Sequence, residues 1–251
     1  MKDVETDRMP DVELDWSVVR PAKMNAEMMR ALLDAGLLEG RKVELRHGEL
    51  VEAEPSKILR DVRIDPELRR HGLHPAPVDA AMMDALIDAG TLRDRRYELI
   101  QGRFIEMSPG KNLHGTILGE AFVQLYNGAK NGLSLAIDVA VRLDADTIVG
   151  PDIIVLPKGL SSDDAGGSDA LLIVEISNST LSQDMKAKAR LYAMHGVIDY
   201  WVVDIPNRLI HVHRDPSPNG YNSVVARPWT EPVTALNAPD LTLSLPEGFG
   251  R

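Results

Sequence analysis

The stretch Leu171-Leu-Ile-Val-Glu175-Ile-Ser177 decides the fold, because it is a near-continuous apolar run that a single carboxylate interrupts. Such a run is typical of a strand inside a sheet whose two faces are both covered. A carboxylate there is costly to bury unless an arginine, another cation or a metal ion compensates it. The stretch therefore predicts a central strand on which Glu175 belongs either to a functional site or to a structural ion pair.

The segments on either side of this strand contain a second acid and a lysine. Pro151-Asp152-Ile-Ile-Val-Leu156 predicts a neighbouring strand that begins with an acid. A short amphipathic helix is predicted after Glu175, and on it Lys188 lies one turn from Asp184 and one turn from Tyr192. Because residues one turn apart are neighbours on a helix surface, these three side chains are expected to share one face.

Asp152, Glu175 and Lys188, in this order, point to a particular chemistry. Acids on neighbouring strands can hold a hard divalent cation through oxygen ligands, and a nearby ammonium can offset the charge of a phosphate. The pattern therefore predicts metal-dependent phosphodiester hydrolysis, with Lys186 as the substitute for Lys188. The alternatives are a surface acid at a strand start, a structural ion pair and a solvated helix lysine.

The composition indicates a soluble globular protein with a substantial core. The chain has 251 residues, of which 44% are hydrophobic, and the lack of cysteine excludes disulfides, cysteine zinc sites and thiol nucleophiles. Its formal net charge of −10 disfavours a general polyanion binder, so a nucleic-acid contact requires a local basic patch. The opening residues lack the apolar core of a signal peptide, and no apolar run is long enough for a membrane span. We therefore expect a cytoplasmic protein that does not contact a membrane.

Two segments in the N-terminal half resemble each other. Residues 24–55 and 78–109 align without gaps at an offset of 54. Each segment predicts a short helix that ends at a glycine, followed by a hairpin, which in the second segment turns at Gln101-Gly102. Two copies are too few for a solenoid, so the segments predict a partial repeat of one helix–hairpin unit.

Only the second copy is followed by the acid-bearing strands, so the first copy is a fragment. Pro75 and Pro77 favour extended backbone and predict a linker between the copies. We therefore expect residues 1–74 to form an extension and residues 75–251 to form the main domain, which should stay folded when the extension is deleted. Three roles stay open for the extension: packing its hairpin on the main sheet, pairing with a second subunit in a homodimer, or covering the cleft.

The remaining patterns predict a mixed α/β (α+β) fold. Residues 112–125 have an apolar stripe at helical spacing, and the tail from Pro228 has extended character without an assigned pairing. Two strand pairs are predicted by four apolar segments: residues 133–143 with 147–156, and residues 200–204 with 209–213. The expected architecture is a mixed central sheet flanked by helices.

Two other patterns carry less weight. His211 and His213 share one face of a strand, but without a third ligand an exposed polar face explains them better than a metal site. Tyr200 and Trp201 could stack on a base, yet within an apolar run they are better explained as core residues.

An ordered set of short motifs runs through about residues 76–215. In chain order these motifs are Arg95-Arg-Tyr-Glu-Leu-Ile-Gln-Gly102, Met107-Ser-Pro109, His114, Pro151-Asp152, Val174-Glu-Ile-Ser177, the helix with Asp184, Lys188 and Tyr192, and Gly196-Val-Ile-Asp-Tyr-Trp-Val-Val-Asp204. The set resembles the Uma2 family of proposed endonucleases, which is placed in the PD-(D/E)XK, or restriction-endonuclease-like, superfamily. The resemblance implies a restriction-endonuclease-like fold.

The resemblance also implies roles for individual residues. Asp152 and Glu175 would bind Mg²⁺, with Mn²⁺ as a substitute and the carbonyl of Ile176 as a third ligand. The superfamily pattern places a lysine two residues after the glutamate, where this chain has Ser177. The role of that lysine then moves to Lys188 on the helix, as the pattern of the family implies.

Glu98 and His114 match two further positions of the family pattern. Glu98 would bind a second metal ion or hydrogen-bond the site, but Glu44 occupies the equivalent place in the fragment, so a structural role is an equal alternative. His114 would act as a general base or contact a phosphate, because a histidine pKa lies near neutrality. The alternative for His114 is a hydrogen bond at the start of a helix.

These expectations define one leading function and two alternatives. The leading hypothesis is a Mg²⁺-dependent endonuclease that hydrolyses phosphodiester bonds of DNA. The second is a nucleic-acid-binding or regulatory module that keeps the fold without turnover, which Ser177 and the acidic net charge favour. The third is a protein-interaction scaffold in which the acids only balance basic side chains. Metal binding that depends on Asp152 and Glu175 separates the first from the third, and salt-dependent DNA binding without cleavage favours the second.

Overall fold

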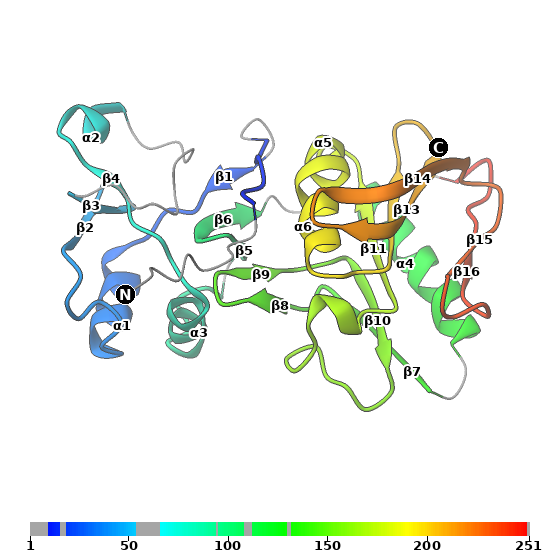
Figure 1. The fold of residues 1–251 in the computed structure, drawn as a ribbon, viewed down its shortest axis with the longest axis horizontal. Helices are drawn as coiled ribbons and strands as arrows, with labels where there is room; N and C mark the ends of the chain where they lie inside the picture. The colour runs from blue at the N-terminus through cyan, green and yellow to red at the C-terminus, as the bar shows by residue number, and fades with distance from the viewer. Residues whose placement is uncertain are drawn as a thin grey trace, which may run out of the picture. The chain divides into compact units, whose positions relative to one another are not determined.

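The chain divides into two compact units in the computed structural model (Figure 1), which describes residues 10–15, 19–53, 66–93, 95–107, 112–129 and 132–249. The first unit combines residues 1–15, 110–141 and 151–251, and the second combines residues 16–109 and 142–150. Each unit therefore contains segments that are far apart in the sequence.

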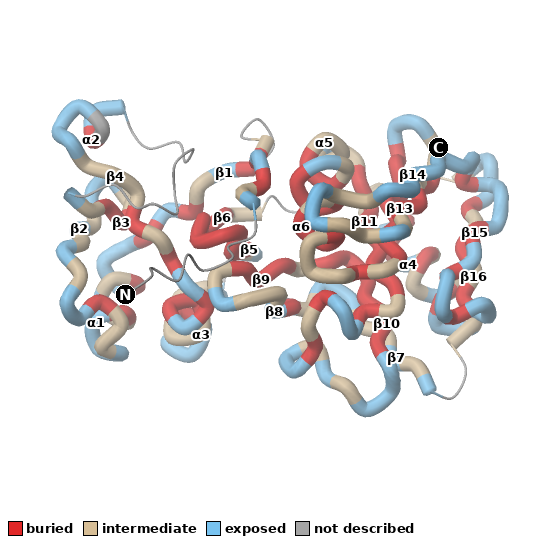
Figure 2. Tube along the Cα trace, viewed as in Figure 1, coloured by how far each residue is buried: buried red, intermediate tan, exposed pale blue. Residues whose placement is uncertain are grey.

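A six-stranded mixed sheet with the strand order β14-β13-β12-β11-β10-β7 forms the first unit. Its strands are β7 (Leu133–Ile137), β10 (Ile153–Pro157), β11 (Leu172–Ser177), β12 (Asp199–Asp204), β13 (Leu209–Ser217) and β14 (Gly220–Pro228). β11 and β12 are parallel, and the other neighbouring strands are antiparallel. Every residue of β11 is buried, and Figure 2 shows the buried trace along this strand. The apolar stretch around Glu175 is thus an interior strand, as predicted.

Helices cover both faces of this sheet. The helical elements of the unit are α4 (Asn112–Gly128), the 3₁₀ turn η1 (Gly167–Asp169), α5 (Leu181–Gln183), the π-helical turn η2 (Asp184–Lys188) and α6 (Ala189–Met194). The apolar stripe of α4 packs on one face, where Ile117 and Leu125 join a core with Val174 and Trp201. On the other face, Tyr192 of α6 packs against Tyr200 of β12. The predicted mixed sheet with flanking helices is confirmed.

The C-terminal tail completes the core on the α4 side. The short strands β15 (Val233–Thr234) and β16 (Thr242–Leu243) pair with each other, and Leu241, Leu243 and Leu245 are buried. The tail is bonded to β12 through Asp199, whose carboxylate accepts a hydrogen bond of 2.7 Å from the N–H of Leu236. The sequence predicted extended backbone here but not this pairing.

Among the residues that the structure describes, the second unit contains two smaller sheets and three helices. One sheet has the order β1-β6-β5-β9-β8, with β1 (Arg20–Pro21), β5 (Arg96–Ile100), β6 (Arg103–Met107), β8 (Val141–Asp144) and β9 (Thr147–Val149). The other has the order β2-β3-β4, with β2 (Val43–Arg46), β3 (Glu49–Glu52) and β4 (His74–Pro75). The helices are α1 (Ala26–Asp34), α2 (Pro66–Arg70) and α3 (Ala80–Asp88).

The two similar segments have matching local backbones. α1 and α3 are each nine residues long, and Asn25 and Asp79 cap them through side-chain oxygens that accept backbone N–H bonds. Each hairpin turns through two residues of positive φ: 50° and 78° at His47-Gly48, and 49° and 79° at Gln101-Gly102. Such turns match the twist of the flanking strands. The ends of the aligned segments, residues 54–55 and 108–109, lie outside the described residues.

The compact units do not coincide with the boundary expected near residue 74. α1 packs against α3, and their buried residues share one core that also includes Leu50, Leu99 and Ile148. The hairpin β2–β3 forms its own sheet with β4 and does not join the six-stranded sheet. This shared core gives a physical reason to expect that deleting residues 1–74 would expose apolar surface of α3.

The strand pair predicted from residues 133–143 and 147–156 is divided between two sheets. β7 pairs with β10, whereas β8 and β9 belong to the sheet of the second unit. Within the described part of the chain, no helix is long and apolar enough to cross a membrane.

Candidate active site

The structure brings the two predicted acids together at one end of β10 and β11. Ile153 pairs with Val174 in antiparallel register, so Asp152, one residue before, continues that register opposite Glu175. Directly opposed residues in an antiparallel pair project on the same side of the sheet. Both side chains are almost inaccessible, with 5% of Asp152 and 4% of Glu175 exposed. Two buried carboxylates at one place require compensating groups.

His114 and the backbone of Ile176 compensate Asp152. The N–H of Ile176 donates to Oδ2 of Asp152 at 2.7 Å, and Nε2 of His114 lies 3.3 Å from Oδ1. The other ring nitrogen of His114, Nδ1, lies 2.8 Å from the carbonyl oxygen of Ile176. His114 at the start of α4 therefore bridges the carboxylate and the backbone of β11. The Ile176 carbonyl, the expected third metal ligand, contacts the imidazole here.

The pKa values of this pair move in opposite directions. The hydrogen bond to Asp152 is the largest influence on His114 and raises its pKa above the ordinary value, although burial opposes the rise. For Asp152, burial is the largest influence and by itself raises the pKa. The hydrogen bond and charge of His114, the Ile176 N–H and the charge of Lys188 outweigh it, so the pKa of Asp152 is lowered overall. The contacts thus favour an ionised carboxylate beside a charged imidazole.

Lys188 and Tyr192 compensate Glu175. Nζ of Lys188 and the hydroxyl of Tyr192 each donate to Oε1 of Glu175 at 3.0 Å. The lysine is itself buried, with 3% exposed, whereas Lys186 on the same helix is exposed. Lys188, and not its substitute Lys186, is therefore the lysine of this helix that contacts the acid pair, through Glu175.

A third carboxylate, Asp184, lies beside this group and had no predicted role of its own. Its Oδ2 accepts a hydrogen bond of 2.7 Å from Thr180, whose hydroxyl lies 3.4 Å from that of Ser177. Burial raises the pKa of Asp184, against the charge of Lys188 and the hydroxyls of Thr180 and Ser177. The four-residue spacing of Asp184, Lys188 and Tyr192 was the signal for this cluster. Ser177, at the usual lysine position, belongs to the hydroxyl chain that ends at Asp184.

Glu98 belongs to the other compact unit. It lies on β5, is 3% exposed, and its Oε1 accepts a hydrogen bond of 3.0 Å from the N–H of Gly150. Gly150 follows β9 and precedes Pro151-Asp152 in the chain. The described contact of Glu98 is therefore with the segment that leads into the acid-bearing strand.

The two strand histidines lie in different surroundings. His211 is partly exposed and its Nε2 lies 3.0 Å from Oδ2 of the buried Asp204. His213 is only 2% exposed and packs between Tyr200 and Tyr221, so the prediction of an exposed polar face is wrong for this residue. α6 and β14 pack against this part of β13, and burial lowers the pKa of His213 to about 4. Tyr200 itself is fully buried, as its apolar surroundings predicted.

The donor chemistry of the site fits Mg²⁺ or Mn²⁺. Asp152, Glu175 and the Ile176 carbonyl are hard oxygen donors, and Mg²⁺ is commonly bound through one or two carboxylates with several waters. Among the described residues, no three or more histidines, aspartates or glutamates are grouped as metal ligands. A dedicated cage made only of these side chains is therefore absent from that part of the chain.

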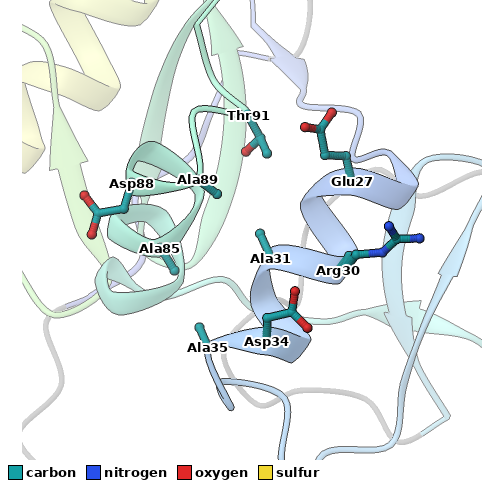
Figure 3. A pocket seen from close by; sticks show the side chains of 9 residues that line it. All are labelled: Glu27, Arg30, Ala31, Asp34, Ala35, Ala85, Asp88, Ala89 and Thr91. Atoms are coloured by element: carbon teal, nitrogen blue, oxygen red, sulfur yellow. The ribbon is translucent and has the colours of Figure 1, made fainter.

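A groove of about 420 Å³ lies between α1 and α3 in the second unit (Figure 3). It is lined by the alanines Ala31, Ala35, Ala85 and Ala89 and by charged residues, which Figure 3 labels as Glu27, Arg30, Asp34 and Asp88. None of the predicted site residues lines it.

The mixed sheet, with paired acids at one end and a lysine on a packed helix, agrees with the restriction-endonuclease-like fold that the motifs of this chain resemble. The model of the Uma2 family, described as "Putative restriction endonuclease", matches residues 84–248. The chain belongs to this family. Among solved structures, one titled as a putative nuclease belonging to DUF820 from Anabaena variabilis is similar, with a TM-score of 0.49 and 17% identity over 60% of this chain and 88% of that chain. None of the curated proteins matches the chain.

Proposed function

We propose that this protein is a Mg²⁺-dependent endonuclease that hydrolyses phosphodiester bonds of DNA, with Mn²⁺ as a substitute ion. One observation carries the proposal: Asp152 and Glu175 oppose each other at the end of two buried strands, and Lys188 reaches Glu175 from the packed helix. Membership of the Uma2 family supports the reaction class. The choice of the metal follows from the oxygen donors of the site. The choice of DNA follows from the resemblance to the superfamily.

Asp152 and Glu175 would hold the ion, which polarises a phosphoryl oxygen and lowers the pKa of bound water. Lys188 supplies a fixed positive charge close to the carboxylates, where it would stabilise the negative charge that develops on the phosphate. Lys188 is buried, so its charge acts in surroundings that screen it less than water does.

His114 acts in this proposal by orienting Asp152. It contacts both the carboxylate and the Ile176 carbonyl, so it fixes the end of β10 against β11. Glu98 has a supporting role, because it accepts a bond from the segment leading into Asp152. Both residues would then change the geometry of the site without touching the reacting atoms.

A second function is favoured by a specific observation. Lys188 already compensates Glu175 and His114 already compensates Asp152, so both acids are balanced by protein groups. A nucleic-acid-binding or regulatory module that lost turnover would need only this balance. Salt-dependent DNA binding without cleavage is the result that this alternative predicts.

The test is cleavage of supercoiled plasmid in Mg²⁺ by the full chain and its variants. We expect Asp152→Asn, Glu175→Gln and Lys188→Met each to lower the rate at least about 100-fold, the scale for losing a group that stabilises the transition state. Lys186→Met is the matched control, because Lys186 is exposed on the same helix, and it should cleave like wild type.

Removing one partner of a buried ion pair can also unfold a protein, at a cost of about 3–5 kcal/mol. The double variant Glu175→Gln, Lys188→Met removes both charges together and should stay folded while being inactive. Cleavage at the wild-type rate by a folded Asp152→Asn protein would overturn the proposed site.

A further inference from the structure

The helix that follows β11 is interrupted by a π-helical turn at Asp184–Lys188. The N–H of Ala189 donates to the carbonyl oxygen of Asp184, which is a bond between residues five apart instead of four. Such turns are rare, and single ones inside α-helices are frequent at functional sites. This one begins at the buried Asp184 and ends at Lys188.

The turn changes which side chains align along the helix. Asp184, Lys188 and Tyr192 are spaced four residues apart and are all buried. In a regular α-helix of 3.6 residues per turn, positions eight apart are about 80° out of line. A wider turn reduces this difference, so Asp184 lies nearer the helix face from which Lys188 and Tyr192 each donate to Oε1 of Glu175 at 3.0 Å. The π-helical turn thus sets the rotation of Lys188, and of the regular α6 with Tyr192 that follows it, relative to the backbone at Asp184.

Tyr200 on β12 bonds to the carbonyl that makes this turn. Its side chain is fully buried, and its hydroxyl donates to the carbonyl oxygen of Asp184 at 3.0 Å. A carbonyl oxygen can accept two hydrogen bonds, and here they come from Ala189 and from Tyr200. The ring of Tyr200 is fixed by Tyr192, with ring centroids 4.9 Å apart, and by His213 at 5.2 Å.

The hydroxyl of Tyr200 also stays protonated, so it remains a hydrogen-bond donor. Burial raises its pKa well above the ordinary value, so the hydroxyl remains protonated. A buried tyrosine hydroxyl requires a partner, and among the hydrogen bonds described for this residue its partner is the Asp184 carbonyl. The sheet therefore holds the helix backbone at one defined carbonyl.

We propose that Tyr200 is a positioning residue whose hydroxyl fixes the π-helical turn at Asp184 and thereby keeps Lys188 on Glu175. The proposal rests on the proposed function only in taking Lys188 as the cation of the active site. Without the hydroxyl, the Asp184 carbonyl loses one of its two donors, and the turn can relax to the regular α-helical register. A relaxed turn would rotate Lys188 relative to the backbone at Asp184, and Nζ would leave Oε1 of Glu175.

Tyr200→Phe tests this, because it keeps the ring and removes one oxygen atom. Tyr221→Phe is the matched control. Tyr221 belongs to the same aromatic cluster, and its hydroxyl also donates to a backbone carbonyl, that of Val197 at 2.8 Å, outside the π-helical turn. Each variant loses one hydrogen bond from a tyrosine hydroxyl to a backbone carbonyl, buried at Tyr200 and partly buried at Tyr221, so a purely structural effect should not be confined to Tyr200→Phe.

The first readout is the rate at which an amine-acylating reagent modifies Lys188, measured by peptide mass spectrometry on the full chain. The exposed Lys186 on the same helix is the internal reference. We expect the Lys188-to-Lys186 rate ratio to rise at least tenfold in Tyr200→Phe and to stay within twofold of wild type in Tyr221→Phe. An unchanged ratio in Tyr200→Phe, or an equal rise in both variants, would overturn the proposal.

The second readout is plasmid cleavage, which separates this proposal from the proposed function. Tyr200→Phe should lower kcat at least tenfold with KM within twofold, because the cation is displaced while the DNA-binding surface is retained. If the wild type does not cleave DNA, the proposed function fails, and the labelling ratio still decides the role of Tyr200. If the wild type cleaves and Tyr200→Phe cleaves equally fast, the positioning role fails and the proposed function stands.

Discussion

Glu44 and Glu98 hold equivalent positions in the two similar segments, yet they differ in burial and in hydrogen-bond partner. Glu44 is exposed on β2 and pairs with Arg46 at 2.6 Å. Glu98 is buried on β5 and accepts a bond from Gly150. The local backbone is the same in both, including the positive φ values of the hairpin turn. The surroundings, and not the local sequence, decide which glutamate is buried.

The difference comes from neighbouring strands. β2 is an edge strand of a three-stranded sheet, whereas β5 lies between β6 and β9 in a five-stranded sheet. The strand β9 comes from residues that follow only the second segment. An interior strand must satisfy its polar side chains within the protein, whereas an edge strand leaves them to water. Comparing the two segments therefore separates what local sequence specifies from what partner strands impose.

The largest expected effect tests the feature that the two segments share. Leu32 and Leu86 are equivalent and fully buried, while the equivalent Leu33 and Ile87 are 57% and 50% exposed. Because emptying a packed core site costs about 2–5 kcal/mol, Leu32→Ala and Leu86→Ala should each lower the free energy of unfolding by about 3 kcal/mol. Leu33→Ala and Ile87→Ala should each change it by no more than about 0.5 kcal/mol. Urea unfolding of the four variants measures this.

If Leu32→Ala were mild while Leu86→Ala was severe, the first segment would not share the core of the second. A truncated chain of residues 75–251 that unfolded as cooperatively as the full chain would lead to the same conclusion. The shared core predicts a less stable truncation, because α1 no longer covers α3.

A smaller effect separates the two glutamates themselves. Glu98→Ala removes the acceptor for Gly150 and should cost about 2 kcal/mol, since an unsatisfied buried group costs about 1–3 kcal/mol. Glu44→Ala, at an exposed ion pair, should stay within about 0.5 kcal/mol of wild type. Thermal and urea unfolding compare the two, and equal losses would contradict the role assigned to the interior strand.

Glu98→Gln sharpens this contrast, because the amide keeps an oxygen acceptor and removes the charge. A supporting Glu98 predicts that this variant still cleaves DNA. Loss of cleavage with unchanged stability would instead assign Glu98 to the chemistry.

The smallest effect concerns two histidines on one strand face. Burial lowers the pKa of His213 from 6.5 to about 4. Between these two values, His213 is protonated in the unfolded chain and neutral in the folded chain. Stability due to His213 is therefore fully present above pH 6.5 and falls as the pH drops toward 4. Between pH 7.5 and 5.5 the loss should be about 1 kcal/mol.

Urea unfolding at these two pH values measures the loss, with His213→Phe as the test and His211→Phe as the control. The first substitution should remove about 1 kcal/mol of the pH dependence, because phenylalanine does not titrate. If His213→Phe retained the full pH dependence, another group would be responsible.

Much of the fold followed from local patterns. The interior strand around Glu175, the short helices of the two similar segments, the Gln101-Gly102 turn and the helix with Lys188 all lie where local sequence patterns predicted them. These features depend on spacing within a few residues, which a sequence displays directly.

The features that the sequence did not predict depend on partners far along the chain. The separation of β8 and β9 from β7 and β10, the burial of His213 under α6 and β14, and the pairing of the tail are long-range choices. The spacing of Asp184, Lys188 and Tyr192 predicted a shared face but not the π-helical turn that aligns them. That turn needs a bond from Tyr200, which belongs to another strand.

The central claim is that Asp152 and Glu175 form a metal site. Calorimetric titration with Mn²⁺ or Mg²⁺ tests it most directly, using the folded wild type and the folded double variant Asp152→Asn, Glu175→Gln. We predict one binding event in the wild type that is absent from the double variant. Equal binding by both proteins would contradict the claim, because the metal would then be held elsewhere.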